Sequence, residues 1–172
     1  MNDYKIKLTG LKDGNYSNSF KIRDEFFEAF EKSEIKFIDI KADTLLEINQ
    51  KKMSVEISLD GVYKDVPCDI CTERIDIPIS SKTNYIIQKG LESTFFDDNI
   101  IYINENEKNI NLTNVFYDMI VLAFPTKRQH KLNSTNDDEC NKEMINLINK
   151  YSIKEQKEID PRWEALKNIK LK

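Results

Sequence analysis

Met53-Ser54-Val55-Glu56-Ile57-Ser58-Leu59 is the stretch that decides the fold, because apolar and polar residues alternate strictly along it. A period of two places one set of side chains on the buried face of a β-strand and the other set on the opposite face. The same period recurs through residues 35–81. We therefore predict several short antiparallel strands in this region, punctuated at Asp60-Gly61 and at Pro67-Cys68.

The residues before this sheet predict a hairpin followed by a short helix. Residues 4–8 alternate as a strand, and a turn at Gly14-Asn15 leads to a second run that ends at Ile22. In residues 23–32, phenylalanines recur at helical spacing, with acidic residues in the first turn and a lysine in the last. We expect this helix to pack on the sheet.

The residues after the sheet predict one more strand and three helices. Residues 100–103 are apolar and strand-like, and Thr113 is a candidate cap for a helix that ends before Pro125. Two more helices are predicted at residues 139–151 and 160–169, the last beginning with a capping aspartate and a proline. The predicted fold class is therefore α+β: a meandering antiparallel sheet, open or barrel-like, with a short N-terminal helix and C-terminal helices.

The composition indicates a globular protein that folds without disulfides. The chain has 172 residues, of which 40% are hydrophobic and 33% charged. We expect an α+β core domain over residues 1–125, and a basic loop with C-terminal helices over residues 126–172, packed on the core or extending from it.

Composition also restricts the expected partners. The longest apolar run, residues 119–124, is far too short to span a bilayer, and the first residues lack the pattern of a signal peptide, so we expect a cytoplasmic protein with no membrane partner. With four glycines and no glycine-rich loop, no small-molecule substrate is expected. A net charge of −4 disfavours coating nucleic acid by phosphate neutralisation alone.

Cys68 and Cys71 form a Cys-x-x-Cys pair where one predicted strand ends and the next begins. In a reducing compartment such a pair binds metal or is redox-active. The chain has one further cysteine, Cys140, and one histidine, His130. Three thiolates and one imidazole are a ligand set for tetrahedral zinc, so we predict one structural zinc ion on these four residues.

Other uses of these residues stay open. A redox pair needs its first cysteine at a helix start, whereas strands flank this pair and Asp69 opposes thiolate formation. Cysteine catalysis with His130 as the base would need an oxyanion hole, and no motif for one is present. Cys140 is alternatively a small buried side chain on its helix.

Two basic segments are candidate partner-binding surfaces. Lys127, Arg128 and Lys131 crowd into a polar loop, and Arg162 and Trp163 begin the last predicted helix. We predict that these residues contact RNA or a partner protein. The simpler alternatives are a solvated surface of mixed charge and a tryptophan docked on its own domain.

Three stretches, in a characteristic order and spacing, cover most of the chain. They are Leu59-Asp60-Gly61-Val62-Tyr63 with Cys68-Asp69-Ile70-Cys71 and Ile77-Pro78-Ile79; Asn109-Ile110-Asn111-Leu112-Thr113 with Ala123-Phe124-Pro125; and Asp160-Pro161-Arg162-Trp163-Glu164-Ala165-Leu166. Together they resemble the bacterial YceD family of large ribosomal RNA subunit accumulation proteins. The chain departs from the commoner family pattern at Ile70 and Thr72, where Arg and Leu are frequent, and at His130 and Cys140, which stand in place of a second cysteine pair.

The resemblance implies a non-enzymatic bacterial factor that supports accumulation of large-subunit ribosomal RNA, and hence assembly of the large subunit. Its implied partner is ribosomal RNA or a ribosomal or assembly protein. Two alternatives belong to other classes. One is an adaptor that binds protein and never touches RNA, and the other is a metal- or thiol-dependent enzyme that acts on nucleotides or RNA.

Overall fold

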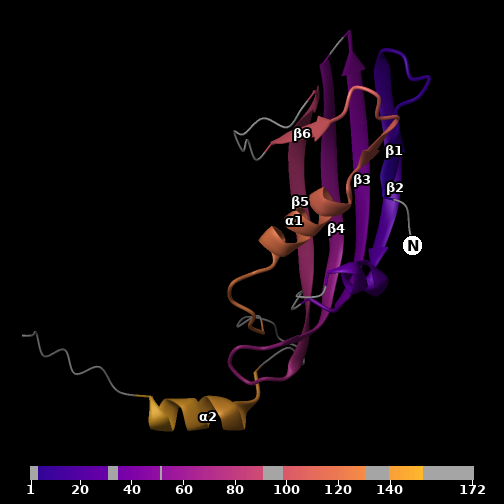
Figure 1. The fold of residues 1–172 in the computed structure, drawn as a ribbon. Helices are drawn as coiled ribbons and strands as arrows, with labels where there is room; N and C mark the ends of the chain where they lie inside the picture. Colours follow the sequence, from indigo (N-terminus) through magenta and orange to yellow (C-terminus); the bar gives the residue numbers. More distant parts are fainter. Residues whose placement is uncertain (1–3, 31–34, 51, 91–98, 131–139, 153–172) are drawn as a thin grey trace, which may run out of the picture.

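Five strands form the main sheet of the protein, in a computed structural model that describes residues 4–30, 35–50, 52–90, 99–130 and 140–152 (Figure 1). In order across the sheet, the strands are β2 (Gly14–Arg23), β3 (Phe37–Asn49), β4 (Lys52–Pro67), β5 (Arg74–Lys89) and β6 (Ile100–Ile103). Strands β2 to β5 pair antiparallel with their neighbours, whereas β6 pairs parallel with β5. The sheet is therefore mixed and open, and the predicted antiparallel meander covers β2 to β5 only.

The predicted break at Asp60-Gly61 is wrong, because β4 continues through both residues. Gly61 lies opposite Ile40 of β3, and a Cβ atom added to it would lie 2.2 Å from the Asp39 carbonyl oxygen. A glycine within a strand often marks a place where another backbone approaches closely. Here it permits β3 and β4 to run side by side over their full length.

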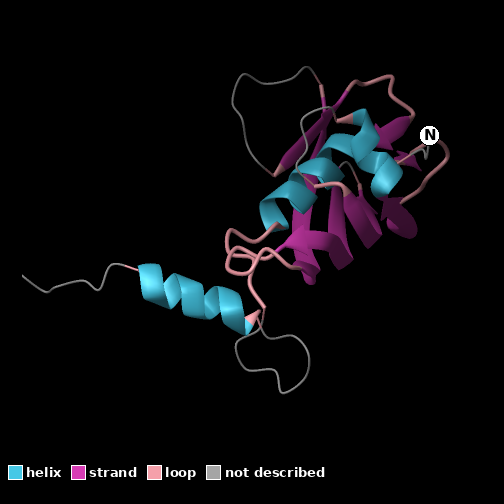
Figure 2. Ribbon diagram, turned by 90° about the horizontal axis from the view of Figure 1, so that it is seen from below, coloured by secondary structure: helices cyan, strands magenta, loops and turns pink. Residues whose placement is uncertain are grey.

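One face of the sheet carries the core. Leu46, Val55, Ile57 and Leu59 point into it and are fully buried, as the period of two predicts. Helix α1 (Thr113–Ala123) lies across this face, and Figure 2 shows it on one side of the strands. The buried Tyr63 hydroxyl donates to the Ile120 carbonyl at 2.6 Å, which satisfies one of the carbonyls that the end of α1 leaves without a helical partner.

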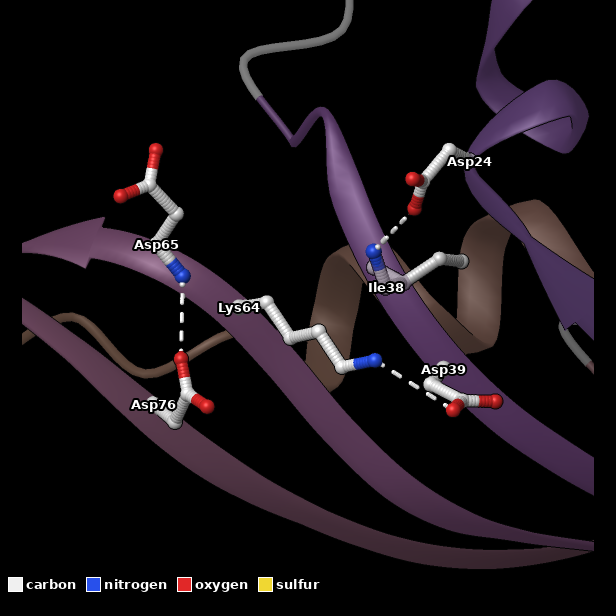
Figure 3. Close-up of polar contacts among 6 residues, drawn as sticks. All are labelled: Asp24, Ile38, Asp39, Lys64, Asp65 and Asp76. Carbon is white, nitrogen blue, oxygen red and sulfur yellow. Dashed lines mark hydrogen bonds and ion pairs between the residues drawn. The ribbon is translucent and has the colours of Figure 1, made fainter.

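The predicted N-terminal α-helix is wrong. Its place is taken by η1 (Asp24–Ala29), a short 3₁₀ helix in which the Phe30 amide donates to the Phe27 carbonyl at 2.9 Å. Phenylalanine is a poor helix former, and here the aromatic rings pack on one another instead of forming the stripe of a longer helix. The Asp24 carboxylate accepts the Ile38 amide at 2.8 Å, which fixes η1 to the start of β3 (Figure 3).

The predicted N-terminal hairpin is also wrong. Strand β1 (Lys5–Lys7) does not pair with β2, because it pairs antiparallel with β7 (Asn109–Asn111) in a separate two-stranded sheet. Ile6 and Ile110 are partners in this sheet, and both are buried. The long-range pair therefore buries two apolar side chains in the common core.

Helix α2 (Lys142–Tyr151) begins three residues later than predicted and extends away from the sheet (Figure 1). None of its residues is buried, and Leu147, Ile148 and Tyr151 are exposed. The helix predicted at residues 160–169 lies outside the described residues.

The described part of the chain is mostly β-sheet, so the predicted α+β class is wrong. The predicted division into two parts at residue 125 stays a prediction. No helix in the described ranges has the length and apolar character to cross a membrane.

Candidate metal centre

The connection between β4 and β5 is a tight hairpin that carries Cys68 and Cys71. The Cys68 amide donates to the Glu73 carbonyl at 2.8 Å, and the Thr72 amide donates to the Cys68 carbonyl at 3.0 Å. The Ile70 amide points at the Cys68 sulfur, 3.5 Å away. Both cysteines are buried. The turn therefore holds their two sulfurs close together, and its Ile70 amide is placed to donate to a Cys68 thiolate.

A β-bulge precedes this hairpin and directs the end of β4. The β4–β5 register shifts between Tyr63 and Val66, and Asp65 adopts a positive φ of 58°. Its amide donates to the Asp76 carboxylate at 3.1 Å instead of joining the ladder (Figure 3). Because a bulge bends the strand that contains it, this one contributes to the direction in which the cysteine hairpin leaves the sheet.

The two distal residues close the cluster from a different part of the chain. His130 follows the segment after α1, and Cys140 lies just before α2. The His130 Nδ1 atom lies 3.5 Å from the Cys71 sulfur and 3.3 Å from the Cys140 sulfur, and the Cys68 and Cys140 sulfurs are 3.6 Å apart. All four donor atoms lie within 4.8 Å of one another, so the structure brings together the four residues singled out in the sequence.

These distances fit a tetrahedral ion. Zinc holds sulfur at about 2.3 Å and imidazole nitrogen at about 2.0–2.1 Å, which places two sulfurs about 3.8 Å apart and a sulfur and a nitrogen about 3.6 Å apart. The measured separations of 3.6, 3.5 and 3.3 Å are slightly shorter than these values. Little movement would be needed to admit an ion between the four donors.

The electrostatics of the cluster also favour a cation. Burial raises the pKa of Cys68, but backbone N–H groups of Cys71 and Ile70 and contacts with His130 outweigh this effect and lower it to about 6. Burial, and then the neighbouring Cys68 and Cys71 sulfurs, raise the pKa of Cys140 to about 11. One thiol therefore ionises readily while another resists, and a bound divalent cation would relieve the repulsion between several thiolates.

Only part of the predicted partner-binding set lies in the described ranges. Lys127 is exposed. Arg128 is half-buried, because its side chain is held by Asp69 and its guanidinium carbon lies 5.7 Å from the centre of the Phe124 ring. Lys131, Arg162 and Trp163 lie outside the described residues, so their predicted roles stay predictions.

Asp69, Glu73 and Asn141 hold the cluster together and were not predicted to do so. Asp69 lies between the cysteines, and its pKa is lowered because the Arg128 amide, and then the Arg128 side chain, donate to its carboxylate. Glu73 accepts a hydrogen bond from Asn141, the residue after Cys140. Their only sequence signal is that each lies within two residues of a cysteine.

Comparison with known proteins identifies a family for most of the chain. Searches of curated proteins and of solved structures find no significant match. A family model described as "Large ribosomal RNA subunit accumulation protein YceD" matches residues 55–170, which include the cysteine hairpin, both distal donors and α1. Since the match spans more than half of the sequence, the chain belongs to the YceD family of large ribosomal RNA subunit accumulation proteins.

Proposed function

We propose that this protein is a non-enzymatic factor of the bacterial cytoplasm that supports accumulation of large-subunit ribosomal RNA through binding, with one structural zinc ion on Cys68, Cys71, His130 and Cys140. The observation that carries the zinc assignment is the convergence of four donor atoms within 4.8 Å. Family membership supports the role in ribosomal RNA accumulation.

The donor set supports a structural rather than a catalytic ion. Catalytic zinc usually has three protein ligands and keeps a position open for water or substrate, whereas structural zinc is enclosed by four. Here three sulfurs and one nitrogen supply all four positions, and both hairpin cysteines are buried. In this arrangement the ion would tie His130 and Cys140 to the β4–β5 hairpin.

Charge pairing beside the centre favours a protein partner as a second candidate. Lys64 pairs with Asp39 at 3.3 Å, Arg74 with Asp65 at 3.8 Å and Arg128 with Asp69 at 2.8 Å (the first pair is drawn in Figure 3). These three cations and Lys36 line one groove with a volume of about 440 Å³. Cations already paired with carboxylates attract phosphate less strongly, so this surface suits a protein with mixed charge at least as well as RNA.

The metal assignment is tested by measuring zinc per chain after purification without added metal. We expect about one zinc per chain, as one four-ligand site requires. Cys68→Ser should remove it, because a serine hydroxyl is a poor zinc ligand. Ser80→Ala on β5 is a matched control that should leave the zinc content unchanged. A zinc-free wild-type protein would reject the structural ion.

The partner is tested by co-purification from growing cells, with identification of bound RNA and protein. Recovery of large-subunit precursor particles would support an assembly factor, and their absence would count against it. Lys127→Ala with Lys131→Ala should weaken recovery if the basic loop makes the contact, while Lys82→Ala on β5 serves as the control. RNA contact predicts a steep loss of affinity with added salt, whereas contact with protein alone predicts a shallow one.

A further inference from the structure

We propose that Asp69 and Glu73 are positioning residues for the centre, each of which ties one distal ligand to the cysteine hairpin. This inference rests on the zinc site proposed above. It assigns the assembly of that site to two side-chain links, named here the Asp69 link and the Glu73 link. It also gives Arg128 a role within the centre rather than in contacting a partner.

The Asp69 link holds the segment that carries His130. The Asp69 amide donates to the Arg128 carbonyl at 2.7 Å, and the Arg128 amide donates to the Asp69 Oδ2 atom at 2.7 Å. The Arg128 Nε and Nη2 atoms lie 3.0 and 2.8 Å from Asp69 Oδ1. Backbone and side chain of both residues are therefore engaged, two positions before His130.

The Glu73 link holds the segment that carries Cys140. The Asn141 amide side chain donates to the Glu73 Oε1 atom at 3.1 Å, while Glu73 Oε2 lies 3.9 Å from the Cys71 sulfur. The Asn141 Oδ1 atom accepts the backbone amides of Glu143 and Met144 at 2.9 and 3.4 Å. Asn141 is thus both the cap of α2 and the partner of the hairpin, so this link also places the start of α2.

The two links matter because the centre joins residues far apart in sequence. The Asp69 link spans 59 positions and the Glu73 link spans 68. Ordering the segments that carry the distal ligands against the hairpin has an entropic cost, which a metal ion would otherwise have to offset alone. When protein contacts already hold the ligands near one another, less of the free energy of metal binding is used to order the chain. Such a site therefore binds metal more tightly.

A plain surface ion pair would not have this effect. The Asp69 and Arg128 side chains are 32% and 30% exposed, and at such exposure the ion pair alone is worth little. The contribution comes from the paired backbone contacts and from the two guanidinium nitrogens that converge on Asp69 Oδ1, which together fix the orientation of the segment before His130. Residues that support metal ligands in this way typically change metal affinity about 10–100-fold when replaced.

The test measures zinc affinity by competition with a chromophoric chelator, for the wild-type chain and for Asp69→Ala, Asp69→Asn and Glu73→Ala. We expect affinity to fall about 10–100-fold in Asp69→Ala and Glu73→Ala, and by less in Asp69→Asn, which keeps one acceptor oxygen. Asp43→Asn is the matched control, because Asp43 forms an exposed pair with Lys41 on β3 and should leave affinity unchanged.

Cobalt substitution separates positioning from ligation. The thiolate-to-cobalt absorption of the variants should match the wild type at saturation, because the ligands themselves are unchanged. Unchanged zinc affinity in Asp69→Ala and Glu73→Ala would overturn the inference while leaving the zinc site intact, and so would an altered cobalt spectrum. If the wild type bound no metal, the zinc site itself would be rejected. Asp69 and Glu73 lie on separate links, so misfolding of one variant leaves the other informative.

Discussion

Thr72 follows the second cysteine with a φ of 63°, in the left-handed region that β-branched residues rarely adopt. Its side chain is exposed, so its removal costs little packing and one hydrogen bond, from the Thr72 hydroxyl to the Cys71 carbonyl at 2.6 Å. The left-handed conformation costs an L-residue roughly 1–2 kcal/mol, which glycine avoids. We expect Thr72→Gly to raise the free energy of unfolding by about 1 kcal/mol, measured by urea denaturation.

Thr83 provides the comparison for this prediction, because it lies within β5. Thr83→Gly should lower the free energy of unfolding by roughly 0.5–1 kcal/mol, since glycine within a strand is destabilising. A loss of stability in Thr72→Gly similar to that in Thr83→Gly would show that Thr72 is not strained.

Zinc affinity should fall as the pH is lowered. Binding requires thiolates. With a pKa of about 6, Cys68 is already ionised at neutral pH. Cys140 has a pKa of about 11, so it must release its proton to solvent when the metal binds. Below about pH 6 Cys68 also carries a proton that zinc must displace, so the decrease becomes steeper. Chelator competition across this range, with proton release measured by calorimetry, checks the sign. An affinity independent of pH would contradict thiolate ligation.

At the residue scale, the four metal donors could be predicted from the sequence because the chain has three cysteines and one histidine. The roles of Asp69 and Glu73 could not be predicted. Each depends on a hydrogen bond to a residue about 60 or more positions away, and no local pattern reports such a contact. Arg128 was assigned to a partner for the same reason, since its own partner lies in the distant hairpin.

Among the elements, β4 depends most visibly on a single residue. A Cβ atom at Gly61 would lie 2.2 Å from a backbone oxygen of β3 and 2.7 Å from the Ile40 Cα atom, and backbone atoms cannot turn aside as a flexible side chain can. We expect Gly61→Ala to lower the free energy of unfolding by about 1–3 kcal/mol, the usual range for an overpacked interior. Thermal and urea unfolding measure this loss.

Ser58→Ala tests whether any change in β4 has the same effect. Ser58 lies on the same strand and is only partly buried, so its replacement should shift the free energy of unfolding by no more than about 0.5 kcal/mol. Equal stability of Gly61→Ala and the wild type would mean that β3 and β4 can separate at this point without cost.

The sequence predicted the elements of the sheet better than their connections. Alternation in residues 53–59 is a local property of one strand, and β4 follows it closely. The pairing of β1 with β7 and the parallel pairing of β6 depend on contacts between distant residues, which no local period encodes. Phe26 and Phe27 are buried, as packing on the sheet requires, but they lie in a short 3₁₀ helix rather than in the predicted α-helix.

At the scale of the whole molecule, the sheet and the metal centre are separate sources of order. The main hydrophobic core joins the two sheets, η1 and α1, and contains none of the four donor residues. We therefore expect zinc removal by a chelator to leave the core intact while α2 loses its attachment. Hydrogen exchange should show Ile57 and Leu59 still protected, and Ile145 and Ile148 exchanging faster.

The Cys68→Ser variant gives the control for the chelator experiment, because it should reproduce the metal-free exchange pattern without a chelator. Loss of protection at Ile57 on metal removal would contradict the independence of the sheet. The same measurement on Gly61→Ala should show the opposite pattern, with weakened protection in β3 and β4.

Helix α2 has no buried residue, and the bond from Asn141 ties its start to the hairpin. A screen that selects only for folded, abundant protein would therefore not detect the loss of a metal donor, since the sheet would still form. A screen that selects for growth when ribosome number limits the growth rate would detect the loss of a metal donor, if α2 must be held in place to act. Comparing the two screens over Cys68, Cys71, His130 and Cys140 would separate what the chain needs to fold from what the cell needs from it.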